Sequence, residues 1–221
     1  MSLPVPNCIS GSQYMITFTD DFSCWVWAFF LQRKSDAFAV FKQWKVQVEK
    51  ESGKSIRVFR TDNGGEYFSN VWTSYMKDEG IRWETTTART PEQNGVSERL
   101  NRSIMDRVRT ILIDAGLPLN LWAEAVSYIV HTKNHNPTRT LSTTPFEMCY
   151  NNKPDLSRSH RFGCVVYVLD DSPERRKLDP KGKCTLFVGY SETQKGWRVY
   201  HLDKRKIQVS AHIKFDDDAD L

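Results

Sequence analysis

Apolar residues form strand-like runs and helix-like spacings in turn through the first half of the chain. Residues 13–19 (QYMITFT) and 24–31 (CWVWAFFL) are rich in aromatic and β-branched residues and predict two strands. The short polar stretch at 20–23 predicts a hairpin turn between them. An amphipathic helix is predicted next, with Ser35 as its N-cap and an end at residues 52–54. Its apolar side chains recur at spacings of three and four, at Phe38, Phe41, Trp44 and Val48.

The following segments continue this alternation. Residues 56–59 predict a buried strand, and 70–79 predict a helix that stops at Gly80. Another strand is predicted at 81–85, and a long helix at 91–114. A hairpin followed by alternating helices and strands is typical of an α/β layer.

The long helix separates an apolar side from a charged side. Its apolar residues are spaced by four, four and three, at Leu100, Ile104, Val108 and Ile111. At 100° per residue, Glu98 lies on the opposite side, which it shares with Arg102, Met105 and Arg109. Taken alone, this pattern predicts a solvated face with a weak ion pair between Glu98 and Arg102.

A further helix is predicted at 121–135, followed by a linker. The helix carries His131 and His135, whose spacing places both on one face, as in helical metal sites. No acidic residue follows His131 as it does in zinc-protease motifs, so we interpret this segment as an ordinary helix. Residues 143–148 and 152–154 predict a linker with turns.

The chain changes character after residue 159. Four short strands separated by turns predict a small all-β unit; they lie at 162–169, 185–190, 198–202 and 207–213. Basic residues gather here, in a pattern that suits contacts with phosphate groups, although a solubilising surface is the alternative. They are Arg158, Arg161, Arg175, Arg176, Lys177, Lys181, Lys183, Lys204, Arg205 and Lys206. Residues 216–218 predict a frayed acidic tail.

Composition narrows the protein class. The 221 residues are 39% hydrophobic and 26% charged, which are ordinary values for a globular protein, and the net charge is +4. The sequence contains no run of 18 apolar residues, so no membrane span is predicted. The first residues lack the basic start and the apolar core of a signal peptide. Five scattered cysteines without a C-x-x-C motif predict neither a disulfide framework nor a zinc finger. This usage favours a reducing compartment.

Two carboxylates stand out by their positions. Asp62 follows the predicted strand at 56–59 and precedes a Gly-Gly turn, where a side chain is held rigidly and still meets solvent. Glu98 lies on the long helix, and 98 − 62 − 1 = 35 residues separate the two. Carboxylates on separate rigid elements are the ligands that Mg²⁺ needs. In two-metal sites, such ions stabilise the attacking and leaving oxygens of a phosphodiester.

The segments around these carboxylates carry a family resemblance. Residues 61–67 (TDNGGEY) and 90–99 (TPEQNGVSER) resemble the second and third parts of the D, D-35-E signature of integrases, in particular the copia-type branch of LTR retrotransposons. The resemblance implies a ribonuclease-H-like integrase core at 1–150 with a helical extension. It also implies a small Src-homology-3-like β-barrel at 151–221 of a Pol polyprotein, for which the matching segments are RFGC, KLDP and FVGY, at 161–164, 177–180 and 187–190.

The same resemblance implies a reaction and its residues. Asp62 and Glu98 would be catalytic and would bind Mg²⁺ or Mn²⁺, while DNA ends are processed and joined to target DNA. The residues expected to contact nucleic acid are Arg60, Arg89, Gln93, Asn94, Arg102, Arg175, Arg176 and Lys177. Retroelement ends and target DNA are the expected partners, with RNA as a further one and a homo-oligomer in the intact protein. The expected location is the nucleus, with a cytoplasmic stage and no secretion.

A third carboxylate is required to hold two cations. Whether the chain has one decides between an active integrase and the alternative functions. In the family it lies on a strand before the segment that matches residues 14–21, whereas residues 1–13 contain no Asp or Glu. We therefore expect an N-terminally truncated copy with little or no activity. Asp20 is a candidate substitute, although paired Asp residues are common in hairpin turns. The alternative functions are a non-catalytic or domesticated nucleic-acid-binding remnant and a nuclease that cuts RNA in a hybrid; the Asn94–Arg99 motif argues against the nuclease.

Overall fold

The computed structural model describes residues 7–61, 70–85, 91–138, 141–169, 176, 178 and 180–216, and at 91–96 the backbone alone. The chain divides into two compact units. The first comprises Met1–Leu3, Ser12–Thr17 and Phe29–Ser103, and the second comprises Pro4–Gly11, Phe18–Ala28 and Ile104–Leu221. The division passes through a β-hairpin and through one long helix, so both units are built from segments that are distant in sequence.

The predicted hairpin is confirmed with slightly shorter strands. β1 (Tyr14–Thr19) and β2 (Val26–Leu31) pair in a two-stranded sheet. The Asp20 N–H donates to the Trp25 carbonyl at 3.0 Å, which closes the turn. A 3₁₀ turn, η1 (Lys34–Asp36), then leads into α1 (Ala37–Ser52).

The start of α1 differs from the prediction, and its end agrees with it. Ser35 lies inside η1, and Asp36 occupies the N-cap position of α1. The reason is a local competition: the Asp36 carboxylate accepts a hydrogen bond from the Arg33 N–H at 3.0 Å and thereby forms the tighter 3₁₀ turn first. Gly53 ends the helix with a φ of 65°, a left-handed conformation that glycine adopts at low cost.

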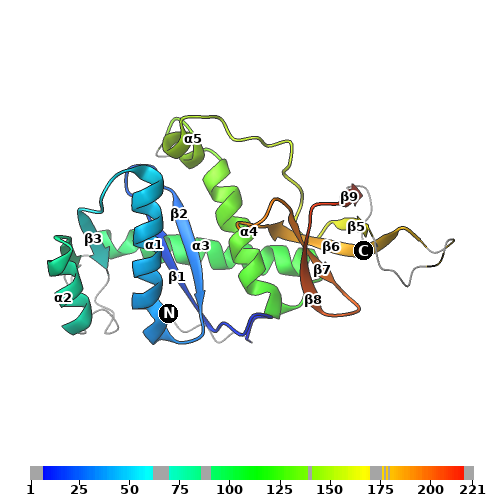
Figure 1. Ribbon diagram of the computed structural model, residues 1–221, viewed down its shortest axis with the longest axis horizontal. Coiled ribbons are helices and arrows are strands. Elements are labelled where there is room, and N and C mark those ends of the chain that lie inside the picture. The colour runs from blue at the N-terminus through cyan, green and yellow to red at the C-terminus, as the bar shows by residue number, and fades with distance from the viewer. Residues whose placement is uncertain are drawn as a thin grey trace. The chain divides into compact units, whose positions relative to one another are not determined.

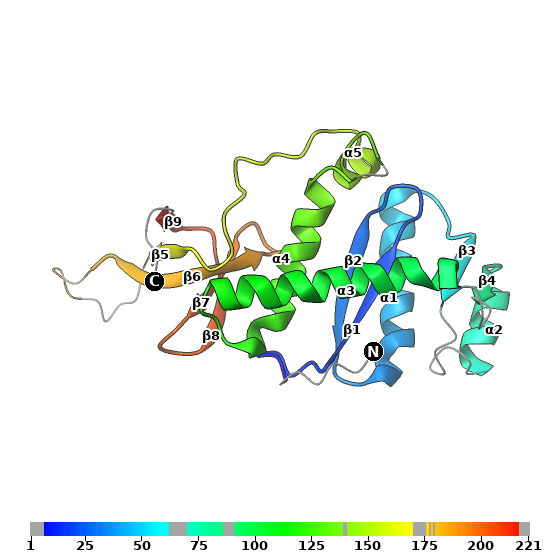
Figure 2. The ribbon, with the colours of Figure 1, turned by 180° about the vertical axis from the view of Figure 1, so that it is seen from behind.

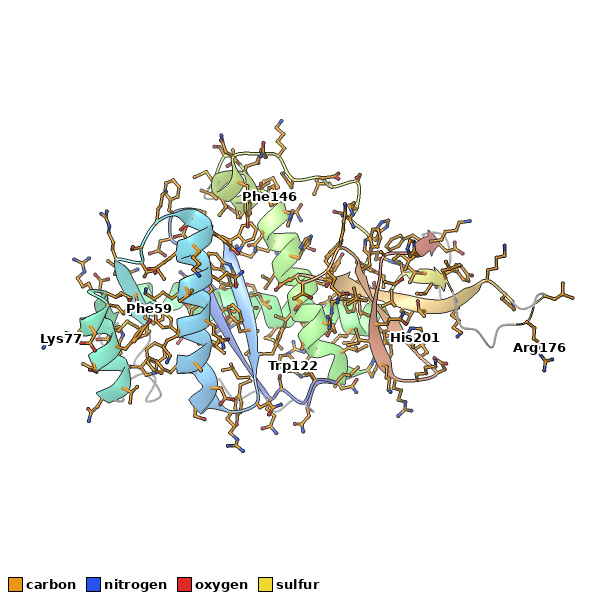
Figure 3. The ribbon with its side chains drawn as sticks, viewed as in Figure 1. Phe59, Lys77, Trp122, Phe146, Arg176 and His201 are labelled. Carbon is orange, nitrogen blue, oxygen red and sulfur yellow. The ribbon has the colours of Figure 1, made fainter. Side chains whose placement is uncertain are left out.

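An aromatic cluster forms the core of the first unit. β3 (Val58–Thr61) pairs in parallel with β4 (Arg82–Thr85), and α2 (Asn70–Asp78) lies between them in sequence. Phe59 of β3 stacks on Trp72 of α2 and lies 4.5 Å, centroid to centroid, from Phe41 of α1. Figure 1 shows β3 beside α1 and α2, and Figure 3 shows Phe59 directed into the space between these helices. The apolar spacing in α1 therefore serves to bury this cluster.

A partly buried ion-pair network fixes α1 to the residues that follow α2. Lys45 of α1 is 7% exposed, and its Nζ lies 2.7 Å from a Glu49 oxygen and 3.0 Å from a Glu79 oxygen. Burial works to lower the pKa of Lys45, but the hydrogen bonds and charges of Glu49 and Glu79 outweigh it and raise the pKa. The pairing of Lys45 with Glu79 could not be predicted, because the two residues lie 79 − 45 = 34 positions apart.

The long helix has the predicted bounds and the predicted buried side. α3 spans Pro91–Asp114 and is continuous in Figure 2, with Pro at its first position and Gly116 beyond its end. Ile104 and Val108 are each 2% exposed, as expected. Leu112 completes the stripe at 1% exposed, in place of Ile111, which is half-buried.

Helix α4 anchors the second unit. η3 (Leu119–Leu121) leads into α4 (Trp122–His135), which packs against strand β6 of the five-stranded sheet. The Tyr128 side chain joins the sheet's apolar core, and its hydroxyl donates to the His160 carbonyl at 2.9 Å. The Glu124 carboxylate accepts two hydrogen bonds from Arg198, at 2.6 and 2.7 Å. Hydrogen bonding to Glu124 raises the pKa of Arg198, so this guanidinium stays charged.

The predicted linker at 143–148 contains a helix, which corrects our interpretation. α5 spans Pro145–Tyr150. Thr144 and Glu147 form a capping box: the Glu147 N–H donates to the Thr144 hydroxyl at 3.1 Å, and the Thr144 N–H donates to Glu147 at 2.8 Å. The backbone hydrogen bond from Thr144 lowers the pKa of Glu147. The T-P-F-E sequence is the local signal for this helix, because it places Thr144 and Glu147 at capping-box spacing with Pro145 at the first helical position.

The C-terminal β unit is confirmed, with five strands in place of the four that we predicted. The antiparallel strands lie in the order β8-β7-β6-β5-β9. They are β5 (Val165–Leu169), β6 (Gly182–Tyr190), β7 (Trp197–His201), β8 (Lys206–Ser210) and β9 (Ile213–Asp216). The predicted strand at 207–213 is split at Ala211 and His212, because β8 pairs with β7 whereas β9 crosses to pair with β5. Asp216 belongs to β9, and 217–218 lie outside the described residues.

Candidate metal and nucleic-acid site

Strand β3 ends at Thr61, the residue before Asp62 in the sequence. Thr61, the last residue of β3, is 8% exposed, and its hydroxyl accepts a hydrogen bond from Trp83 Nε1 at 3.0 Å. Thr61 also faces Thr85 in the parallel register with β4. Asp62 itself lies outside the described residues. The last described residue before it, Thr61, is buried and hydrogen-bonded.

Glu98 lies on the solvent-exposed side of α3, as the sequence predicted. Its side chain is exposed, and within the described part of the chain no hydrogen bond or ion pair engages its carboxylate. One turn later, Asn101 accepts a hydrogen bond from the Thr17 hydroxyl of β1 at 2.9 Å. This bond and the buried stripe fix the rotation of α3 about its axis, so Glu98 is held toward solvent. The predicted approach of Asp62 to Glu98 stays a prediction, because Asp62 is not among the described residues.

Three of the residues expected to contact nucleic acid have described side chains, and all three are arginines. Arg60 is half-exposed, and its Nη2 lies 3.1 Å from a Glu84 oxygen on the facing strand. Arg102 is exposed on the same helix as Glu98. Arg176 is exposed and extends away from the sheet in Figure 3. Five predicted positions lack described side chains: Arg89, Arg175 and Lys177 lie outside the described residues, and Gln93 and Asn94 are described by backbone alone.

Sequence reasoning missed the partner of Arg60. Glu84 faces Arg60 directly in the parallel register, and Arg82 also contacts Glu84, at 2.9 Å. Alternation along β4 was the available signal, since residues 82 and 84 of a strand point to the same side. The pairing with Arg60 could not be predicted, because it depends on the register between two strands.

Asp20 has a structural role in the hairpin turn. One of its carboxylate oxygens accepts hydrogen bonds from the Ser23 N–H at 2.8 Å and from the Ser23 hydroxyl at 2.6 Å. These bonds support the turn interpretation. The alternative role of Asp20 as a metal ligand stays a prediction.

His131 and His135 stack on each other, with their ring centroids 4.0 Å apart. His131 also stacks on Tyr190 at 4.0 Å, and the His135 ring nitrogen Nδ1 is bonded to the His131 carbonyl at 2.7 Å. Burial, followed by the charge of His135, lowers the pKa of His131 to about 4, so His131 is neutral at physiological pH. The described residues contain no group of three or more His, Cys, Asp or Glu side chains arranged to hold a metal ion.

Comparison with known proteins connects these features to a family. Residues 5–91 match the family described as integrase core domain, and residues 164–221 match the retroviral polymerase SH3-like domain. The chain is 37% identical over 209 residues to the Retrovirus-related Pol polyprotein from transposon TNT 1-94 of Nicotiana tabacum, covering 94% of this chain and 16% of the relative. A second relative, from transposon RE1 of Arabidopsis thaliana, is 32% identical over 93% of this chain and 14% of its own length.

The chain belongs to the copia-type retrotransposon integrases. It spans about a sixth of the Pol polyproteins that it matches. The fold of this integrase chain is shared with a chain of the simian T-cell lymphotropic virus intasome, which was solved in complex with PP2A regulatory subunit B56 gamma. That likeness has a TM-score of 0.52 at 17% identity and covers 96% of this chain and 75% of the viral one.

Both halves of the predicted fold are thus confirmed, namely the ribonuclease-H-like core and the SH3-like β unit. The boundary at 150/151 stays a prediction, since the two family matches end at 91 and begin at 164. Among the described residues, no helix combines the length and the apolar character that a membrane span needs.

Proposed function

We propose that this integrase chain contributes the metal-binding core and a DNA-binding β unit to the joining of retroelement ends to target DNA. The observation that carries the proposal is Glu98, an exposed carboxylate that pairs with no other described residue, on a helix whose rotation is fixed, within the integrase motif at 90–99. The family match covers Asp62, the second acidic position of the same motif set. The alternative of a non-catalytic remnant predicts DNA binding without joining.

The donor set fits a divalent cation. Asp62 and Glu98 would supply carboxylate oxygens, the ligands that Mg²⁺ and Mn²⁺ prefer. A bound ion would polarise the phosphodiester and activate the attacking oxygen. The described part of the chain contributes support beside these residues: Trp83 donates a hydrogen bond to Thr61, the residue before Asp62 in the sequence, and Thr17 donates one to Asn101 on the helix that carries Glu98. Arg102 adds positive charge one turn from Glu98 on the exposed face, where a DNA phosphate would be attracted.

Joining of short duplex ends to a plasmid tests the reaction. Because residues 1–13 contain no Asp or Glu, the assay compares the 221-residue chain with the same chain preceded by a strand that bears an Asp. We expect joining with Mg²⁺ or Mn²⁺ from the extended chain, little from the 221-residue chain, and loss of joining in Asp62→Asn. Activity of the 221-residue chain that disappears in Asp20→Asn would show that Asp20 is a ligand. DNA binding without joining by either chain would favour the non-catalytic remnant.

The basic β unit is the proposed duplex-binding surface. Lys204 and Lys206 are exposed around the turn between β7 and β8, and Arg176 is exposed between β5 and β6. Duplex affinity should fall steeply with salt, because each neutralised phosphate releases counterions. We expect the double variant Lys204→Ala/Lys206→Ala to lower both the affinity and the salt slope, measured by fluorescence anisotropy. An unchanged slope would assign duplex binding to the α3 face instead.

Binding of RNA, homo-oligomer formation and nuclear location stay predictions.

A further inference from the structure

The β3–β4 pair has one covered and one exposed face. Phe59, Thr61 and Trp83 belong to one face: Phe59 joins the aromatic cluster, and Trp83 donates the partly buried hydrogen bond to Thr61 described above. Side chains alternate along a strand, so the residues between them belong to the other face. In the parallel register, Val58 faces Arg82 and Arg60 faces Glu84. Val58 is 38% exposed and the Arg82 side chain is 72% exposed, so this second face is open to solvent.

One carboxylate on this face holds two guanidinium groups. The Glu84 oxygen Oε2 lies 3.1 Å from Arg60 Nη2, and the other oxygen, Oε1, lies 2.9 Å from Arg82 Nη2. Both oxygens are therefore occupied, and the three ionised groups together carry one positive charge. Arg82 makes its ion pair through a single nitrogen, whereas a guanidinium has five N–H donors. With its side chain 72% exposed, Arg82 has donors left that face water.

We propose that Arg82 is a phosphate contact for duplex DNA and that the negative charge of Glu84 beside it weakens this contact. The inference rests on the proposed function, since it assigns a further contact to the same DNA. Three features support it. The planar guanidinium fork matches a phosphate group, Arg82 keeps donors that face water beside its ion pair, and β3 leads directly into Asp62 in the sequence.

The competing explanation is an ordinary surface ion pair that only stabilises the pairing of β3 with β4. Such pairs contribute about 0–1 kcal/mol, because solvent screens the charges. The two explanations predict different affinities for DNA in Glu84→Gln. If Arg82 contacts a phosphate, removing the Glu84 charge removes a repulsion toward DNA and strengthens binding. If the pair is only structural, the affinity for DNA is unchanged.

Fluorescence anisotropy of a labelled duplex with the whole 221-residue chain tests the proposal at several salt concentrations. We expect Arg82→Ala to weaken binding about threefold to tenfold at low salt and to reduce the salt slope by about one. Glu84→Gln should tighten binding by about the same factor. Lys77→Ala is the matched control: Lys77 is exposed near the end of α2 in the same unit and is labelled in Figure 3, and its removal should change affinity less than twofold.

The outcomes separate this inference from the proposed function. If the wild-type chain binds duplex DNA and Arg82→Ala binds as well as Lys77→Ala, the inference is wrong and the proposed function is unaffected. If Glu84→Gln weakens binding, the ion pair has a supporting role only and the inference is also wrong. If the wild-type chain does not bind duplex DNA at any salt concentration, both are wrong. Circular dichroism of each variant shows whether the fold is retained.

Discussion

Glu98→Gln should lower metal-dependent DNA joining by about 10²–10³-fold or more while leaving duplex binding intact. The amide has nearly the shape of the carboxylate but carries no charge, so it cannot replace an anionic oxygen as a cation ligand. Losing one electrostatic group at a phosphoryl-transfer site has an effect of this size. Glu98 is exposed and has no bond to other described residues, so its replacement should not weaken the fold. Joining by the extended chain is the measurement.

Asp106→Asn on the same helix is the matched control. Asp106 is exposed and pairs with Arg109 at 3.1 Å, so the control also removes one negative charge from α3. It should change joining less than twofold to threefold, since exposed pairs of this kind have small effects. Equal losses in Glu98→Gln and Asp106→Asn would mean that helix charge in general, and not Glu98 in particular, supports the reaction.

Phe41→Ala should destabilise the first unit by about 3–5 kcal/mol, the usual result of deleting a buried aromatic ring. Phe41 has no exposed surface, and its ring lies within 6 Å, centroid to centroid, of Trp44, Phe59 and Trp72. Removing it leaves a cavity between α1, α2 and β3. Because β3 leads into Asp62, DNA joining should be lost along with stability. Urea unfolding followed by tryptophan fluorescence measures the change in the free energy of unfolding.

Phe22→Ala provides the comparison for this stability measurement. Phe22 is 69% exposed in the hairpin turn, so its loss should change the free energy of unfolding by about 0.5 kcal/mol or less. A change below about 1 kcal/mol in Phe41→Ala would show that the aromatic cluster closes around the missing ring.

Local patterns determined most of the elements. α3 was predicted with its observed bounds because its signals are close together in sequence: Pro91 at the first turn, an apolar stripe, and Gly116 beyond the end. The strands of the hairpin were predicted because aromatic and β-branched residues gather in them. α5 was predictable from its capping box, and the error there was one of interpretation. In the site, the exposed side of Glu98 followed from helical periodicity alone.

The tertiary structure decided which distant residues meet. Glu84 takes both Arg60 and Arg82 because β3 and β4 adopt one particular register. Asn134 of α4 is 3% exposed and pairs its amide with the backbone of Val26, accepting at 3.0 Å and donating at 2.8 Å. Such contacts produce no periodic pattern in the sequence, because the paired residues are far apart: 24 positions for Arg60 and Glu84, and 108 positions for Val26 and Asn134. The sequence alone therefore determined the elements and the two carboxylates of the motif. The strand register decided that Glu84 lies beside Arg60, and the packing of α4 decided that Asn134 bonds the backbone of β2. Both depend on contacts between distant segments, which no local pattern encodes.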